Sequence, residues 1–310
     1  MDKGRCQTGV SFDVEPAMPN SNQLEMSPII AGLWRLTEWN LDVKSRVRWI
    51  EQALELGIST FDHADIYGDY RAEALFGEAL KAAPDLRQRM QLVSKCGIRL
   101  RSADRPYRLN HYDTSPGYIR AQVEQSLRNL HTEQLDLVLI HRPDYLMDAA
   151  ELAATFSALS AEGKVARWGV SNHTASQFAL LNQHHPLLTN QLELSVLAMN
   201  ALDDGTLDQA QLLGLRPMIW SPLGGGRLFG DDDAQAVRLR ETMLPMAERL
   251  GVGLSTLAYA WILRHPSHPR PITGSGRLEG LRDAVAALDV SLSSEDWYAI
   301  WVASHNHGVP

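Results

Sequence analysis

Four side chains of this 310-residue chain have the types and the spacing to transfer a proton at a carbonyl oxygen. Asp62, Lys95 and His141 each stand at the end of a short apolar run, and Tyr67 follows Asp62 by five residues. A tyrosine keeps its proton at pH 7, because its ordinary pKa lies near 10. A neighbouring lysine ammonium favours the phenolate, so we expect Lys95 to lower the pKa of Tyr67. Asp62 would pair with Lys95, and a neutral His141 would orient the carbonyl group.

None of these side chains can supply a hydride, so carbonyl reduction by this set needs a redox cofactor. A metal site is the alternative interpretation, because barrel hydrolases place His and Asp at strand ends. Such sites usually direct several histidines at one point, whereas residues 62–65 and His141 fit a proton relay. We therefore predict no metal.

The reactive side chains follow strand-sized apolar runs. Eight strands are expected, at 28–33, 58–61, 90–94, 135–140, 166–170, 188–192, 217–220 and 271–273. Amphipathic helical stretches are expected at 47–57, 115–130, 147–163, 176–183, 206–213, 234–250, 255–265 and 278–288, and a last helix is expected to begin near Ser293. The longest gap without helical periodicity, 97–115, is predicted to be a long loop.

Repeated strand–helix alternation implies a parallel sheet with helices outside it. Both an open doubly wound sheet and a closed barrel fit this pattern. The count of eight strands and the lack of a G-x-G-x-x-G after the first strand favour an α/β fold of the (β/α)8 TIM barrel type, with an extra C-terminal helix. In such a barrel the strand ends that carry residues 62, 95 and 141 converge on one face. Residues 1–22 are predicted to be a flexible extension, and 23–310 a single barrel domain.

The composition excludes several classes of protein. The formal net charge is −8, which argues against a nucleic-acid partner. No run of about 18 apolar residues is present, which argues against a membrane-spanning helix. Only two cysteines occur, outside any metal-binding spacing, so we expect a reduced, cytoplasmic protein.

Several segments resemble motifs of the aldo-keto reductase superfamily. Residues 60–68 resemble the signature around its catalytic Asp and Tyr, 93–95 the strand that carries its Lys, and 136–144 the strand that carries its His. Residues 163–165 and 169–172 resemble a further hallmark. The resemblance covers about 28–303, and the motifs are most similar to those of the bacterial YdhF-like oxidoreductases.

This resemblance implies an NADPH-dependent enzyme that reduces an aldehyde or ketone to an alcohol by hydride transfer. Tyr67 would be the general acid, Lys95 and Asp62 would tune it, and His141 would orient the carbonyl. NADP(H) would lie across the C-terminal face of the barrel, with Trp220 stacked on the nicotinamide. The implied cofactor-binding residues are Gly32, Trp34, Arg35, Ser171, Asn172, Gln191, Trp220, Ser221, Pro222, Leu223, Gly224, Arg227, Gly274, Ser275, Gly276, Arg277 and Arg282.

Two of these segments are typical of phosphate sites. Glycines 224–226 after the seventh strand allow a pyrophosphate to approach the backbone, and Arg227 can pair with it. Residues 274–277 open a helix after the eighth strand, where N–H groups and Arg277 would take a 2′-phosphate. The family commonly has an arginine where this chain has Gly280, so the strength of the NADPH preference stays open.

A second hypothesis is a regulatory subunit that binds the cofactor on the same barrel and has negligible turnover. The partners expected for the enzyme are a small-molecule carbonyl substrate and no nucleic acid or membrane. We expect a monomer or a weak homo-oligomer.

Overall fold

The computed structural model describes residues 24–102, 104–230 and 232–309. The predicted N-terminal extension, 1–22, lies outside the described residues. No helix in the described part of the chain is long and apolar enough to cross a membrane.

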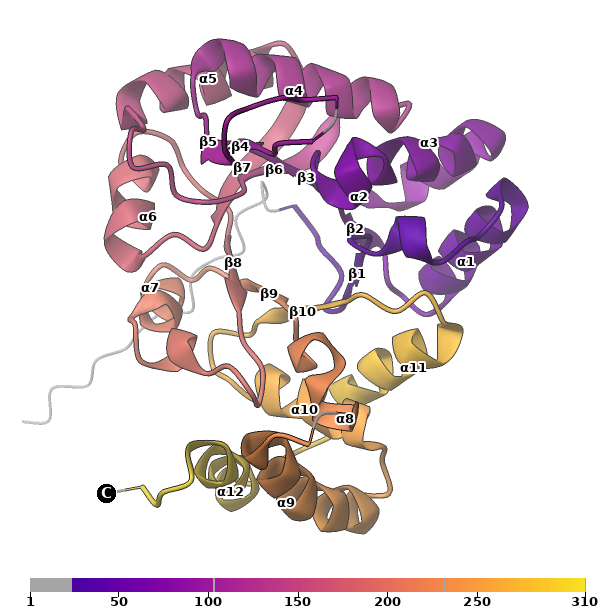
Figure 1. The fold of residues 1–310 in the computed structure, drawn as a ribbon, viewed down its shortest axis with the longest axis vertical. Helices are drawn as coiled ribbons and strands as arrows, with labels where there is room; N and C mark the ends of the chain where they lie inside the picture. The colour runs from indigo at the N-terminus through magenta and orange to yellow at the C-terminus, as the bar shows by residue number, and fades with distance from the viewer. Residues whose placement is uncertain (1–23, 103, 231, 310) are drawn as a thin grey trace, which may run out of the picture.

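Eight parallel strands close into a barrel with helices around it (Figure 1). The strands are β1 (Ile30–Gly32), β2 (Thr60–Asp62), β3 (Gln91–Cys96), β6 (Leu135–Ile140), β7 (Val165–Ser171), β8 (Asn190–Glu193), β9 (Met218–Trp220) and β10 (Arg270–Thr273). The barrel closes because β1 pairs with both β2 and β10. Each of the eight predicted strand ranges overlaps an observed strand, so the predicted (β/α)8 fold is confirmed.

Helices surround the barrel and pack against the outer faces of its strands. The α-helices are α1 (Val43–Glu55), α2 (Tyr67–Tyr70), α3 (Ala72–Ala82), α4 (Pro116–Asn129), α5 (Ala149–Ala161), α6 (Ala175–Asn182), α7 (Thr206–Leu212), α8 (Arg227–Gly230), α9 (Ala234–Leu250), α10 (Leu254–Leu263), α11 (Leu278–Ala286) and α12 (Ser294–His305). Short 3-10 helices are η1 (Leu36–Glu38), η2 (Pro84–Arg89), η3 (Asn200–Leu202), η4 (Gly224–Gly226) and η5 (Ala287–Asp289).

Alternation along the strands divides the core into two clusters and directs the reactive side chains inward. Val93, Leu137 and Leu139 belong to a small cluster inside the barrel, whereas Leu92, Val138 and Ile140 belong to the large cluster under the helices. Side chains two residues apart on a strand share a face. Lys95 therefore continues the inner face of Val93, and His141 continues that of Leu139.

The sequence interpretation missed α3, which lies between β2 and β3. Gly77 interrupts the helical pattern of this segment, and a glycine inside a helix normally counts against helix formation. The structure explains the glycine, because a Cβ at Gly77 would lie 1.8 Å from the carbonyl oxygen of Asn129. Gly77 thus allows α3 to approach the end of α4.

The predicted loop 97–115 contains a short antiparallel ladder. Its strands are β4 (Ile98–Arg99) and β5 (His111–Tyr112), with Ile98 opposite Tyr112. An ion pair between Arg99 and Asp113, with 2.6 Å between Nη2 and Oδ2, holds the base of this segment. The segment is therefore partly ordered by its own contacts.

The predicted extra helix is α12, which lies beside α9 outside the barrel wall (Figure 1). Ser293 caps its N-terminus, because the Ser293 hydroxyl accepts a hydrogen bond from the Asp296 N–H at 3.0 Å. Gln235 of α9 donates from Nε2 to Ser304 Oγ at 2.9 Å, and Arg238 donates from Nε to the Ala303 carbonyl at 3.1 Å. These bonds join the two helices along their polar faces.

Candidate active site

Asp62, Lys95, Tyr67 and His141 lie together at the C-terminal end of the barrel, and we call this group the catalytic corner. Asp62 ends β2, Lys95 lies near the end of β3, and His141 directly follows β6. The Lys95 and Asp62 side chains are 0% and 3% exposed, and their Nζ and Oδ2 atoms are 2.7 Å apart. The convergence predicted from the strand ends is therefore present in the structure.

The ammonium group of Lys95 uses all three of its N–H donors. It donates to Asp62 Oδ2 at 2.7 Å, to the His63 carbonyl oxygen at 2.7 Å and to the Tyr67 hydroxyl oxygen at 2.9 Å. Because the Tyr67 oxygen accepts this bond, its own proton is available for another acceptor. The geometry therefore presents Tyr67 as a proton donor toward the barrel mouth.

Burial raises the pKa of Tyr67 above its usual value, although the nearby charge of Lys95 acts in the opposite direction. This corrects the expectation that Lys95 lowers the pKa of Tyr67, because that expectation neglected desolvation. Burial also disfavours the charged form of Lys95, but attraction to Asp62 and then Tyr67 outweighs it and raises the pKa of Lys95. Lys95 thus stays an ammonium, and Tyr67 stays a neutral phenol.

His141 is neutral in this environment. Its burial, followed by the positive charges of Lys95 and Arg142, holds its pKa well below the ordinary value. The ring lies edge-on to Tyr67, with 5.9 Å between the ring centroids. A neutral imidazole beside a phenol can hold an oxygen atom that receives the phenolic proton.

A tight turn positions Tyr67 over Lys95. Gly68, Asp69 and Tyr70 all have φ angles between 55° and 63°, in the left-handed region. A Cβ at Gly68 would also lie 2.3 Å from Thr37 Cγ2 of η1, so glycine is required there on both counts. The Tyr70 hydroxyl accepts a hydrogen bond from the Leu100 N–H at 3.1 Å, which anchors the far end of the turn.

The residues predicted to face a nicotinamide form one connected polar network beside the corner. Trp220 donates from Nε1 to Asn172 Oδ1 at 2.9 Å, and Asn172 donates from Nδ2 to Ser171 Oγ at 2.8 Å. Gln191 donates from Nε2 to Asp62 Oδ1 at 2.9 Å, so it links this network to the catalytic corner. Gln191 is therefore also a positioning residue for Asp62, a role that the sequence interpretation did not include.

Residues 221–230 and 274–277, which we call the phosphate-side loops, carry most of the other predicted binding residues. Ser221 and glycines 224–226 of the first loop have φ angles in the left-handed region, which favours glycine. Pro222 is buried, and Leu223 and Gly224 are half-buried. A Cβ at Gly276 would lie 2.7 Å from the Trp39 ring, which fixes the path toward α11. Arg277, the N-cap residue of α11, and Arg282 are both exposed.

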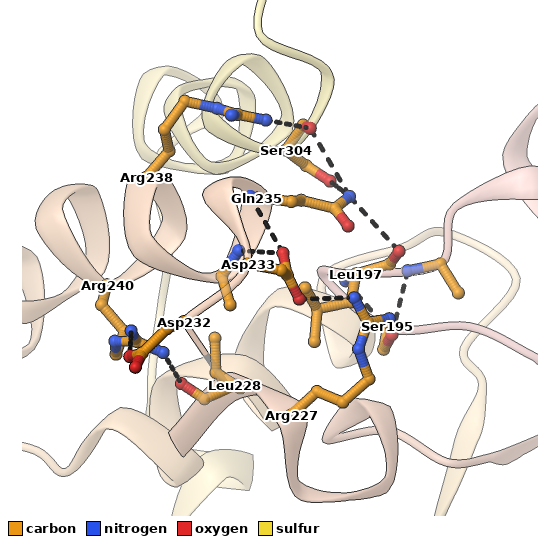
Figure 2. A network of polar contacts seen from close by, with 12 residues as sticks. Ser195, Leu197, Arg227, Leu228, Asp232, Asp233, Gln235, Arg238, Arg240 and Ser304 are labelled. Atoms are coloured by element: carbon orange, nitrogen blue, oxygen red, sulfur yellow. Dashed lines mark hydrogen bonds and ion pairs between the residues drawn. The ribbon is translucent and has the colours of Figure 1, made fainter. Parts of the chain in front are cut away.

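The guanidinium of Arg227 is already engaged by a carboxylate of the protein. It forms an ion pair with Asp233, with 2.7 Å between Nη2 and Oδ2 (Figure 2). Asp233 also caps α9 by accepting hydrogen bonds from the N–H groups of Gln235 and Ala236. An anion at the glycine turn would compete with Asp233 for Arg227.

Gly32, Trp34 and Arg35 lie at the end of β1. Gly32 is buried, whereas Trp34 is 58% exposed and Arg35 lies over its ring at 5.2 Å. Gly280 approaches Ser275 so closely that a Cβ there would lie 2.4 Å from Ser275 Oγ. A larger residue at position 280 would therefore displace Ser275.

The sequence interpretation missed Arg142, which follows His141 at the mouth. Its guanidinium lies over the Trp220 ring at 5.6 Å, and its charge acts on Tyr67, His141 and Glu193. The sequence did contain a signal, because Arg142 directly follows the strand-end residue His141. Within the described residues, no group of three or more His, Cys, Asp or Glu side chains is placed to hold a metal ion.

Comparison with known proteins identifies the family. A model of the Aldo/keto reductase family matches residues 28–303. The oxidoreductase YdhF of Escherichia coli is 50% identical over 92% of this chain and 96% of its own length. A 6-dehydroglucose reductase of Agrobacterium fabrum is 42% identical over 91% and 95%. The structure of a glycerol dehydrogenase from Gluconobacter oxydans, 25% identical, superposes with a TM-score of 0.79 and covers 91% of this chain and 92% of its own.

The match to YdhF extends over nearly the full length of that oxidoreductase, in agreement with the predicted similarity to the YdhF-like group. Aldo-keto reductases use nicotinamide cofactors, and they act on small carbonyl compounds and alcohols. This chain belongs to the aldo/keto reductase family and is an oxidoreductase that acts on carbonyl and alcohol groups.

Proposed function

We propose that this protein reduces an aldehyde or ketone to an alcohol with NADPH as hydride donor and Tyr67 as general acid. The observation that carries this proposal is the set of hydrogen bonds made by the Lys95 ammonium, whose three N–H groups each have an acceptor. Because one of them ends on the Tyr67 oxygen, the phenolic proton is left for an acceptor other than Lys95.

In this mechanism the protein orients the carbonyl group and delivers a proton. His141, held neutral, donates its N–H to the carbonyl oxygen, and Tyr67 transfers its proton to the same oxygen as the alcohol forms. The Lys95 ammonium stabilises the resulting phenolate, and Asp62 holds Lys95 in place. When bound, NADPH supplies the hydride.

The residues present fit a nicotinamide dinucleotide. The Trp220 ring is fixed by its hydrogen bond to Asn172 and offers a flat face, and Ser171 and Gln191 offer polar atoms beside it. The left-handed glycine turn leaves open space, because a Cβ at Gly225 or Gly226 would meet no atom within 4 Å. Arg227 and Arg277 would bind the phosphates.

The mouth of the barrel favours a polyhydroxylated carbonyl substrate. Arg142 offers hydrogen-bond donors there, and the exposed carboxylate of Glu193 offers acceptors. Relatives named for 6-dehydroglucose and for glycerol act on compounds that carry several hydroxyl groups. A panel of short sugars, hydroxyaldehydes and unsubstituted aldehydes tests this point, because faster turnover of the unsubstituted aldehydes would contradict it.

Cofactor titration tests the proposal directly. Intrinsic tryptophan fluorescence should show saturable quenching by NADPH and weaker binding of NADH. The Arg277→Ala variant should weaken NADPH binding by roughly 10- to 100-fold, the range expected for lost charge-assisted hydrogen bonds, and should leave NADH binding nearly unchanged. Equal losses for both nucleotides would show that Arg277 does not contact the 2′-phosphate.

Turnover separates the enzyme from a regulatory subunit that only binds the cofactor. The reductase should oxidise NADPH in the presence of at least one carbonyl compound of the panel. A protein that binds NADPH tightly and turns over none of them would favour the regulatory hypothesis.

A further inference from the structure

The end of the barrel opposite the catalytic corner carries arginines that carbonyl reduction does not use. Arg216 lies two residues before β9, and Arg270 is the first residue of β10, so both stand at the N-terminal ends of their strands. Arg264 is the C-cap residue of α10 and borders the same region. These three residues, the basal arginines, are separated from Tyr67 by the length of the barrel.

A cavity of about 410 Å³ opens at this end. Arg216, Arg264 and His268 contribute polar walls, and Leu263 and Val290 contribute apolar walls. The volume lies within the range of about 300–1,000 Å³ that small-molecule sites occupy. The lining thus combines positive charge with aliphatic surface.

Within residues 24–102, 104–230 and 232–309, none of the basal arginines forms an ion pair. Arg216 donates from Nε to the His268 carbonyl at 2.9 Å, and Arg264 donates from Nε to the Leu292 carbonyl at 3.2 Å. Their terminal nitrogens have no hydrogen-bond partner among the described residues. Asp289 lines the cavity, but it makes no ion pair with them.

Arg270 adds a half-buried charge. Its Nε atom is buried without a hydrogen-bond partner among the described residues. Burial, and then the charge of Arg216, lowers the pKa of Arg270 to about 10, so it remains a cation at pH 7. Burying a charge is unfavourable unless the charge is paired, and two neighbouring guanidinium groups add repulsion. Arg270 does not line the cavity, but an anion beside Arg216 would reduce this repulsion.

We propose that this cavity binds a small multivalent oxyanion, an organic phosphate or polycarboxylate, through Arg216 and Arg264. Planar guanidinium groups bind phosphate and carboxylate oxygens in a bidentate manner. The aliphatic wall would contact the carbon body of the ligand, and Arg270 would add positive charge. This site is separate from the cofactor site and does not depend on the reductase proposal.

Calorimetric titration of the full chain tests the proposal with two probes, inorganic pyrophosphate and citrate, at an ionic strength held constant with NaCl. We expect one site per chain that depends on Arg216, apart from any binding at the proposed phosphate sites of the cofactor. The Arg216→Gln variant should weaken binding at least tenfold. Because Arg216 also supports the His268 segment, the exposed Arg264 provides a second variant, Arg264→Gln, with the same expected loss.

Two control variants locate the binding. Arg48→Gln removes an exposed arginine on α1, and Arg277→Ala removes the predicted phosphate ligand at the other end of the barrel. Both should retain the site that Arg216→Gln removes. Binding of pyrophosphate alone or of citrate alone supports the site and identifies its ligand class. No heat beyond the NaCl control, or an equal loss in Arg277→Ala, would overturn the proposal.

Discussion

The catalytic corner is held by strand ends and buried bonds, whereas the phosphate-side loops are held by turns and exposed charges. Lys95 and Asp62 are almost fully buried, and each Lys95 N–H has a partner within the corner. Arg227 instead pairs with Asp233, and Arg277 is exposed. The catalytic corner is therefore preorganised, whereas the proposed binding of a phosphate by Arg227 would compete with its ion pair to Asp233.

The largest expected effect tests whether the corner acts through Tyr67. The Tyr67→Phe variant keeps the ring and removes the proton donor, so turnover should fall by roughly 10²–10⁴-fold. NADPH binding should stay near the wild-type value in a fluorescence titration. Tyr298→Phe, at an exposed tyrosine of α12 outside the barrel wall, is the matched control and should keep most activity. Wild-type turnover in Tyr67→Phe would remove Tyr67 from the mechanism.

An effect of intermediate size tests whether the surroundings of His63, next to the catalytic corner, exclude water. Burial, and then Lys95, lowers the pKa of His63 to about 3, and neither ring nitrogen has a partner among the described residues. The unfolded chain takes up this proton near pH 6.5, so the contribution to stability is present above pH 6.5 and is lost as the pH falls toward 3. From pH 7.5 to pH 5 the loss should be about 2 kcal/mol.

Urea unfolding at these two pH values measures the loss of stability. The His63→Leu variant should lack this part of the pH dependence, whereas His184→Leu, at an exposed histidine, should retain it. The buried carboxyls of Asp65 and Glu73 have raised pKa values and act in the opposite direction, but they are common to all three proteins. Parallel pH dependence in wild type and His63→Leu would show that water reaches His63.

The smallest expected effect concerns the ion pair between Arg227 and Asp233 in the phosphate-side loops. The Asp233→Ser variant should retain the cap of α9, because serine is also a good N-cap residue, but it loses the ion pair with Arg227. An exposed ion pair is worth about 0.2–1 kcal/mol, so NADPH binding should tighten by about 1.5- to 5-fold. Weaker binding would mean that Asp233 helps to place Arg227 for the phosphate.

Much of the barrel and the convergence of the corner could be predicted, because apolar runs mark strands and parallel strands end on one face. The helix α3 could not, since Gly77 is explained only by the Asn129 carbonyl opposite it. The direction of the Tyr67 pKa shift depends on burial, which is a property of the whole fold. The pairing of Arg227 with Asp233 likewise depends on the path of a glycine-rich turn that has no periodicity.

The bonds between α9 and α12 affect how this protein can be recombined with its relatives. Gln235 and Arg238 both donate hydrogen bonds to Ser304, and the same stretch of α9 begins at the Asp233 cap (Figure 2). A chimera that replaces only the last helix keeps Gln235 and Arg238 but changes the helix that supplies their hydrogen-bond acceptors. The two helices therefore form one exchangeable module, and crossover points are best placed before α9 and after α12.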